Sequence, residues 1–203
     1  SMVDSVLLLV DAVDGPMPQT RFVTQKAFDM GFRPIVVINK IDRDGARPHW
    51  VLDQTFELFD RLGASEEQLD FPVVYASALR GYASLDELVQ EGDMSPLFQT
   101  IVDHVAPPPV NRDGPFQMRI SSLDYNSYVG IIGVGRIQRG ALKPNQRICV
   151  IHPNGESSNA RVLQVLGFHG LQRKEIAEAE AGDIIAVSGV EGLGISDTLC
   201  DRE

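Results

Sequence analysis

Residues that commonly build metal and disulfide sites are scarce in this sequence. Its 203 residues include only two cysteines and four histidines. Cys149 and Cys200 form no Cys-x-x-Cys motif and have no pair of histidines nearby, and the histidines lack partners at the spacing of metal ligands. We therefore expect no metal site, and we expect both cysteines to be reduced, buried thiols of a cytoplasmic protein.

Long hydrophobic runs are also missing. The apolar run at residues 6–10 is far too short to cross a bilayer, and it follows Asp4 rather than the basic segment of an export signal. Hydrophobic residues make up 43% of the chain and charged residues 23%, which is typical of an ordinary globular protein. We accordingly expect a cytoplasmic location and no membrane partner.

The chain has no excess of positive charge. Lys and Arg number 18 against 28 Asp and Glu, which gives a net charge of -10. Residues 1–110 hold 8 basic and 17 acidic side chains, whereas residues 111–203 hold 10 and 11. This balance argues against binding of nucleic acid through bulk charge, so any such contact has to be local.

The first half of the chain alternates short apolar runs with segments of helical periodicity. The apolar runs lack the alternation of a half-exposed strand, so they predict strands of a parallel sheet that helices cover. Leu52, Phe56 and Phe59 recur at the intervals of four and three that place them on one helix face. We expect three βα units, with strands at residues 6–10, 34–38 and 72–76 and helices at 19–30, 50–62 and 96–105.

A proline-rich segment then separates two regions of different periodicity. Residues 106–110 read Ala-Pro-Pro-Pro-Val, which favours an extended, semi-rigid conformation. Beyond it, Phe116, Met118 and Ile120 alternate with polar residues, as in a half-buried antiparallel strand. We predict an α/β domain with three parallel strands at residues 1–106, a linker at 107–114 and an all-β barrel at 115–203.

A tetrapeptide with the chemistry of guanine recognition follows the second predicted strand. It reads Asn39-Lys40-Ile41-Asp42, at the strand end where open α/β sheets bind ligands. Asp42 can accept two parallel hydrogen bonds from N1-H and the exocyclic amino group of guanine, whereas adenine offers a lone pair at its ring nitrogen. Asn39 can donate to the N7 edge, and the alkyl stem of Lys40 can cover the base. The alternative is a solvated turn with a helix-capping aspartate.

A second loop supports this interpretation. After the third predicted strand the chain reads Ala76-Ser77-Ala78-Leu79. In such a loop the backbone N-H of Ala78 can bind the guanine O6, and Ser77 can steady the Asp42 loop. Ser-Ala pairs are common, so the loop is informative only because it follows the strand after the tetrapeptide. We predict a guanine-base site formed by Asn39, Lys40, Asp42, Ser77, Ala78 and Leu79.

Both loops resemble the guanine-recognition motifs of translational GTPases. Residues 4–20 resemble the strand that follows switch II in these proteins, and stretches after residue 130 resemble the barrel domain of elongation factors. Residues 39–48 and 116–136 are most similar to the BipA (TypA) family of ribosome-associated GTPases. The resemblance implies GTP or GDP with Mg²⁺ as cofactors, the ribosome as partner, and a role in translation, ribosome assembly or the stress response.

The phosphate-binding part of a GTPase site is absent from the sequence. No Gly-x-x-x-x-Gly-Lys-Ser/Thr motif and no Asp-x-x-Gly-His segment occurs. The resemblance implies that these parts precede residue 1, so we expect an internal fragment: the carboxyl-terminal half of a P-loop GTPase domain and the second domain. We expect the chain alone to have no catalytic residues, no GTP hydrolysis and no tightly bound nucleotide. The edge of strand 6–10 should be bare, and we expect it to pair with another chain.

Basic residues of the barrel are candidates for contacts with RNA. The resemblance implies that this domain docks on the small ribosomal subunit, where Arg119, Arg136, Arg139 and Lys143 could contact ribosomal RNA. For each residue alone, a solvated strand residue is an equally good interpretation. An alternative function therefore stays open: a non-catalytic chain whose barrel binds RNA or protein and whose α/β half is a scaffold.

Overall fold

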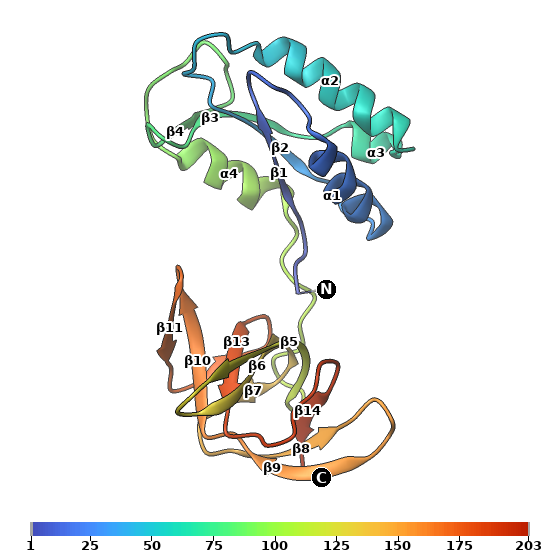
Figure 1. Cartoon of the computed structure of the whole chain (residues 1–203), viewed down its shortest axis with the longest axis vertical. Helices are drawn as coiled ribbons and strands as arrows, with labels where there is room; N and C mark the ends of the chain where they lie inside the picture. The colour runs from blue at the N-terminus through green and yellow to red at the C-terminus, as the bar shows by residue number, and fades with distance from the viewer. Residues whose placement is uncertain (1, 203) are drawn as a thin grey trace. The chain divides into compact units, whose positions relative to one another are not determined.

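The computed structural model describes residues 2–202 of the chain. These residues form two compact units, of which one spans Val3–Pro107 and the other begins at Pro108. The first unit contains helices around a small sheet, and the second is built from strands (Figure 1). Each unit has its own hydrophobic core, so each is described by itself.

In the first unit, helices cover both faces of a four-stranded sheet. The strand order is β1-β2-β3-β4; the first three strands are parallel, and β4 runs antiparallel to β3. The elements are β1 (Leu7–Asp11), α1 (Pro18–Asp29), β2 (Ile35–Asn39), α2 (Pro48–Arg61), α3 (Glu66–Leu69), β3 (Val73–Ser77), β4 (Tyr82–Ser84) and α4 (Ser95–His104).

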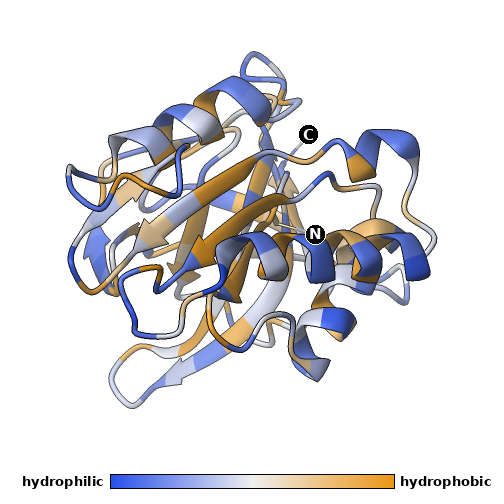
Figure 2. Ribbon diagram, turned by 90° about the horizontal axis from the view of Figure 1, so that it is seen from above, coloured by the Kyte–Doolittle hydropathy of each residue, from blue (hydrophilic) through white to orange (hydrophobic). Residues whose placement is uncertain are grey.

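Side chains of β2 divide between two cores, because successive residues of a strand point to opposite faces of the sheet. Val36 and Ile38 belong to the core that α2 covers, whereas Ile35 and Val37 pack with residues of α4. The strongest hydrophobic colour in Figure 2 accordingly lies on strands, and the helices expose many hydrophilic residues. All four of these residues are buried, which explains why the apolar run lacks alternation.

Phe59 holds α2 against this sheet. Its side chain is fully buried, and its ring contacts the rings of Phe28 and Phe71 edge to face, with centroid separations of 5.1 and 4.8 Å. Phe56, which the helical spacing placed on the same face, is instead 48% exposed. The buried face of α2 is therefore narrower than the sequence pattern indicated.

The predicted fold class is confirmed, and the six predicted elements of this unit lie within two residues of the observed ones. The sequence pattern missed α3 and β4. A capping box between Ser65 and Gln68 caps the N-terminus of α3, which has four residues. Strand β4 has three residues. Elements this short span fewer than two periods of the hydrophobic pattern, so a pattern search does not detect them.

The second unit is an antiparallel β structure of the barrel type. Its main sheet has the order β11-β10-β13-β6-β5-β14-β8-β9, and β12 pairs separately with β7. The strands are β5 (Gln117–Asn126), β6 (Gly130–Arg139), β7 (Ala141–Leu142), β8 (Arg147–Ile151), β9 (Ser157–Arg161), β10 (Gln164–His169), β11 (Gln172–Glu175), β12 (Ala179–Glu180), β13 (Ile184–Ser188) and β14 (Thr198–Asp201).

This unit has a small cluster of Ile132, Val134 and Ala186 as well as a larger core. Phe116, Met118 and Ile120, predicted to alternate inward, are all buried in it. Gly135 on β6 allows the close approach of β5, because a Cβ at this position would overlap the backbone carbonyl oxygen of Arg119. Among the helices formed by residues 2–202, none has both the length and the apolar character needed to span a membrane.

Candidate functional site

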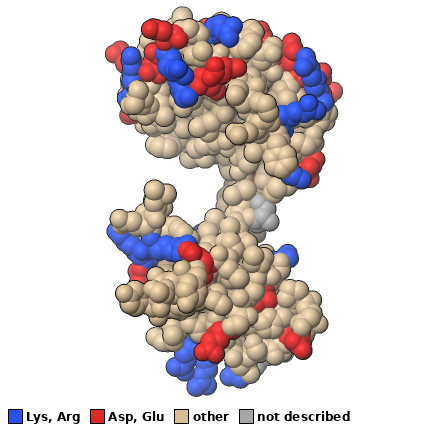
Figure 3. Space-filling view, in the orientation of Figure 1, with Lys and Arg blue, Asp and Glu red and all other residues tan. Residues whose placement is uncertain are grey.

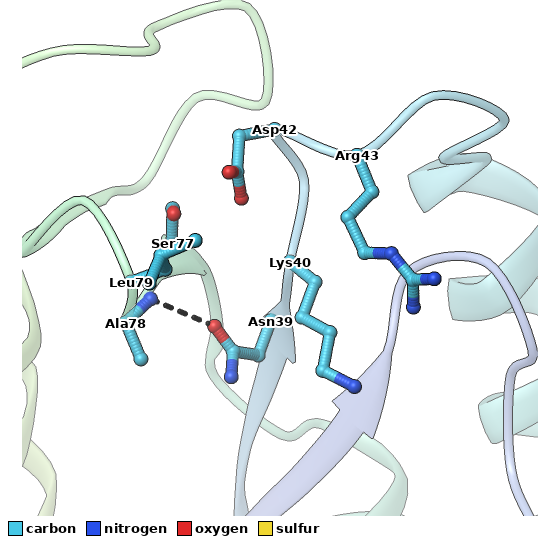
Figure 4. Close-up of a pocket in the computed structure, with 7 residues that line it drawn as sticks. All are labelled: Asn39, Lys40, Asp42, Arg43, Ser77, Ala78 and Leu79. Atoms are coloured by element: carbon cyan, nitrogen blue, oxygen red, sulfur yellow. Dashed lines mark hydrogen bonds between the residues drawn. The ribbon is translucent and has the colours of Figure 1, made fainter.

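Two loops meet at the carboxyl edge of the α/β sheet. β2 ends at Asn39 and β3 at Ser77, and the parallel register sets Asn39 beside Ala76, so the loops that follow start side by side. Figure 4 shows the pocket between them. Its volume is about 220 Å³, and it is lined by Asn39, Lys40, Asp42, Arg43, Ser77, Ala78 and Leu79. The structure thus brings together all six residues of the predicted base site.

A hydrogen bond joins the two loops across the pocket. The backbone N-H of Ala78 donates to the side-chain oxygen of Asn39 at 3.0 Å, as the dashed line in Figure 4 marks. The amide oxygen of Asn39 is therefore engaged, and its NH₂ group is left as the donor that faces a ligand. In this state Ala78 donates to Asn39 rather than outward.

Asp42 is held as a carboxylate on the opposite side of the pocket. A hydrogen bond from the Ser77 hydroxyl is the main cause that lowers the pKa of Asp42, and the charges of Arg80 and Arg43 lower it further. Arg80 Nε lies 3.4 Å from Asp42 Oδ2, and the Asp42 side chain is only 9% exposed. Near neutral pH Asp42 is therefore ionised, and an ionised carboxylate can only accept hydrogen bonds.

Lys40 is fixed at both its backbone and its ammonium group. Its φ of 67° lies in the left-handed region, which a residue with a side chain rarely adopts. Lys40 Nζ lies 2.7 Å from Asp11 Oδ2, an oxygen that also lies 3.7 Å from Arg43 Nη1. The other oxygen of Asp11 accepts the N-H of Val13 at 2.8 Å. This anchoring holds the alkyl stem of Lys40 along the pocket.

The Asp11 carboxylate is stabilised in its charged form. Burial raises its pKa, but hydrogen bonds from Lys40, Val13 and Asp14 together with the charge of Lys40 outweigh that effect, and the net pKa is lowered.

Leu79 contributes an apolar surface to the site, since its side chain is 92% exposed at the mouth of the pocket. The site therefore combines one carboxylate, one amide donor and two apolar surfaces, a set suited to a flat heterocycle with adjacent N-H donors.

Sequence patterns missed three side chains of this site. Asp11 stands at the carboxyl end of β1 and is paired in register with Asn39. Its position at the same sheet edge was a signal that could have identified it. Arg43 and Arg80 follow the two motifs directly, but their contacts with Asp11 and Asp42 depend on loop conformation, which spacing does not reveal.

The barrel brings together only part of the predicted RNA-contact set. Arg119 on β5 and Arg136 on β6 are register partners, and Arg139 pairs with Gln117 farther along the same two strands. Lys143 lies after β7 and forms an ion pair with Glu178 at 3.3 Å. On the face drawn in Figure 3, basic groups of the barrel stand beside acidic ones. Arg173 on β11 pairs with Asp124 on β5 at 2.8 Å. Within residues 2–202, no cluster of three or more His, Cys, Asp or Glu side chains is arranged to hold a metal ion.

Two family models match this chain. The family model described as the elongation factor Tu GTP binding domain matches residues 1–107, which is more than half of the chain. The chain belongs to this family. A second model, described as elongation factor Tu domain 2, matches residues 130–200. Both family assignments agree with the resemblance to translational GTPases found in the sequence.

Curated relatives support the narrower resemblance. The chain is 64% identical over 203 residues to the protein named large ribosomal subunit assembly factor BipA from Escherichia coli strain K12. It is 64% identical over 201 residues to the protein of that name from Haemophilus influenzae and 56% over 200 residues to that from Buchnera aphidicola. These matches cover 98 to 100% of the chain but 33% of each relative. The predicted resemblance to BipA is confirmed, and the chain spans about a third of these relatives' length.

Solved structures show the same fold. Translation elongation factor SelB from Methanococcus maripaludis, in complex with the GTP analogue GPPNHP, aligns over 99% of this chain and 42% of its own, with a TM-score of 0.71 and 20% identity. The apo form of the same factor aligns with a TM-score of 0.71 and 22% identity over 40% of its length. At such identities the likeness establishes the fold only.

Proposed function

We propose that the chain supplies the guanine-recognition site of a ribosome-associated GTPase of which it forms part. The single observation that carries the proposal is the pocket that joins the ionised Asp42 with Asn39 and Ala78 at the carboxyl edge of the sheet. A pocket of about 220 Å³ is smaller than the 300 to 1,000 Å³ usual for drug-sized ligands, and it suits a base rather than a whole nucleotide.

Selection of guanine follows from the charge state of Asp42. The carboxylate accepts N1-H and the exocyclic NH₂ of guanine in a bidentate pair, whereas adenine would set its N1 lone pair against the negative oxygen. The NH₂ group of Asn39 donates to N7. The Ala78 N-H reaches the guanine O6 by turning from the Asn39 oxygen that it meets in this structure. The Lys40 stem and Leu79 flank the two faces of the base.

The chain alone binds nucleotide weakly in this proposal. Charge-assisted hydrogen bonds contribute about 1.5 to 3 kcal/mol each, whereas association costs about 4 to 15 kcal/mol before any affinity is observed. The sequence contains no loop of the Gly-x-x-x-x-Gly-Lys type for phosphates and Mg²⁺. Hydrolysis therefore belongs to the longer protein, in which Mg²⁺ would neutralise phosphate charge, and the isolated chain does not hydrolyse GTP.

Base selectivity tests the proposal. NMR titration of the labelled chain with GMP should shift the amide signals of the Asn39 and Ala78 loops, and AMP should leave them in place. Asp42→Asn should shift the preference from GMP to XMP, because the carbonyl at C2 of xanthine needs a donor. Asp44→Asn, an exposed carboxylate in the same loop, is the matched control and should keep the preference for GMP. Equal shifts with GMP and AMP would instead favour the scaffold function.

The ribosome is the proposed partner, with the barrel as a contact surface for RNA. Register brings Arg119 and Arg136 together, whereas Lys143 is engaged by Glu178. Arg119→Ala should therefore weaken binding to small ribosomal subunits and lower the salt slope by about 1, as expected for one lost phosphate contact. Lys143→Ala should have the smaller effect. Identical salt slopes for wild type and Arg119→Ala would remove Arg119 from the contact surface.

We also propose that β1 pairs with a second copy of the chain. β1 is an edge strand of the sheet, and its Leu7 and Leu9 side chains are 40% and 59% exposed. An unpaired, apolar strand edge is a template for another strand. Sedimentation equilibrium should detect a dimer that Leu9→Lys weakens. A strictly monomeric mass across the concentration range would refute the pairing.

A further inference from the structure

The two cysteines face each other across neighbouring strands of the barrel. Cys149 on β8 and Cys200 on β14 are direct register partners. Their neighbours Val150 and Leu199 point into the core, so the cysteine side chains lie on the outer face of the sheet. Both cysteines are half-buried rather than buried, contrary to the sequence-based expectation, and they line one pocket of about 640 Å³.

Backbone hydrogen bonds define the spacing of this pair. On β14, residues 201 and 197 exchange bonds with β5, as the N-H of Asp201 donates to Phe116 and the N-H of Ile120 to Asp197. The backbone groups of Cys200 therefore face β8. On the far side of β8, the N-H of His152 donates to Glu156 of the turn into β9, so Cys149 faces β14. Cys149 and Cys200 are accordingly a hydrogen-bonded antiparallel pair.

This spacing suits a bridging atom better than a disulfide. Hydrogen-bonded antiparallel partners have Cα atoms about 5.5 Å apart, and their Cβ atoms lie near the upper end of the range of about 4.5 to 5.5 Å. A disulfide needs Cβ atoms about 3.5 to 4.5 Å apart. Two metal-sulfur bonds of about 2.3 Å allow the sulfurs to stand as far as about 4.6 Å apart. A single ion between the two sulfurs fits without moving the strands together.

The surroundings restrict what can bind between the sulfurs. Pro115, Phe116 and Ile151 contribute apolar walls to the pocket, and Arg139 and Arg202 add two basic side chains to its lining. The nearby carboxylate of Asp201 is fully engaged, since one oxygen accepts the Phe116 N-H at 2.7 Å and the other accepts from Gln146 Nε2 at 2.9 Å. Ions that require four ligands are disfavoured, because the described residues include no cluster of three or more ligating side chains.

We propose that Cys149 and Cys200 form a two-coordinate thiolate site for a soft monovalent cation of the Cu(I) type. Soft thiolate ligands select such ions over harder ones. Cys200 Sγ leans toward β8, where it lies 3.7 Å from the carbonyl oxygen of Cys149, whereas Cys149 Sγ lies 3.9 Å from the carbonyl oxygen of Val150 and has to turn toward Cys200 on binding. On binding, two S-H bonds break, two Cu-S bonds form, and both protons pass to solvent. No electron is transferred, so the site needs no oxidant.

Anaerobic titration of the reduced chain with Cu(I), in competition with a chromophoric Cu(I) chelator, tests the site. One equivalent should bind, and X-ray absorption should report two sulfur neighbours. Because the ion would tie β8 to β14, it should raise the unfolding midpoint of the barrel. Cys149→Ser should weaken binding at least about 100-fold, since it removes the second ligand of a chelate.

A variant that keeps two thiols but separates them is the matched control. Cys149→Ser combined with Ile151→Cys moves one thiol two residues along the same outer face, opposite Thr198 instead of Cys200. This variant should bind as weakly as Cys149→Ser if the pairing matters. Equal affinity in wild type and the displaced variant, or no uptake by the reduced wild-type chain, would overturn the proposal. An intact mass lower by two hydrogens under mild oxidation, without Cu(I) uptake, would assign the pair to disulfide chemistry and overturn it too.

Discussion

The α/β unit and the barrel place their polar groups in different ways. In the α/β unit, the ends of β1, β2 and β3 bring Asp11, Asn39 and Ser77 to one edge, where ion pairs and hydrogen bonds organise a pocket. In the barrel, strand register alone sets Arg119 beside Arg136. Register likewise sets Cys149 beside Cys200 on another pair of strands. A site at a strand end is encoded by a few consecutive residues, whereas a site on a sheet face depends on pairings between distant segments.

The two units should respond separately to substitutions, and Phe59→Ala should have the largest effect. Phe59 is fully buried between Phe28 and Phe71, so truncation should destabilise the α/β unit by about 3 to 5 kcal/mol. Urea denaturation followed by fluorescence of Trp50, the single tryptophan, measures this unit. Phe56→Ala on the same helix is the control and should cost about 1 kcal/mol or less. Similar losses in the two variants would contradict the observed burial.

In the barrel, a large effect is expected at Gly135. A methyl group there overlaps the carbonyl oxygen of Arg119, so Gly135→Ala should destabilise the barrel by about 1 to 3 kcal/mol. Far-ultraviolet circular dichroism of the β structure should show the loss, while the Trp50 transition stays in place. Gly167→Ala, where a Cβ would meet only the Ile176 side chain, should be milder. A shift of the Trp50 transition would show that the two units do not unfold separately.

Removal of the Asp11 charge should have an intermediate and pH-dependent effect. The pKa of Asp11 is lowered from 3.8 in the folded chain, so its stabilising contribution is present above that value and is lost as the pH falls through the folded pKa. Asp11→Asn should cost about 1 kcal/mol near pH 7. The difference from wild type, measured by urea denaturation, should shrink in acid below pH 3.8. A pH-independent difference between Asp11→Asn and wild type would contradict the assignment.

The smallest effect is expected at the surface of the barrel. Lys143 and Glu178 are 62% and 46% exposed, so Lys143→Ala should change the free energy of unfolding by less than about 0.5 kcal/mol. Thermal unfolding of the variant beside wild type provides the measurement. A loss of more than about 1 kcal/mol would show that this ion pair has a structural role beyond that of a solvated contact.

The same contrast explains what the sequence could predict. The buried runs of β1, β2 and β3 and the tetrapeptide that starts at Asn39 are local signals. They predicted the three parallel strands and six residues that line one pocket. The partners Asp11 and Arg80 were missed, because their contacts depend on how the loops fold back. The cysteine pair was missed because Cys149 and Cys200 are fifty-one positions apart, and no spacing rule gives the register of β8 on β14.

Lys40 illustrates a conflict between backbone and side chain. With φ at 67°, its backbone adopts a conformation that glycine would accept without strain. Glycine, however, would remove both the ammonium group that meets Asp11 and the stem that borders the pocket. Lys40→Gly should therefore relieve the backbone strain and, at the same time, remove one wall of the pocket. At this position the fold tolerates strain so that a long side chain can stay where a flat ligand would lie.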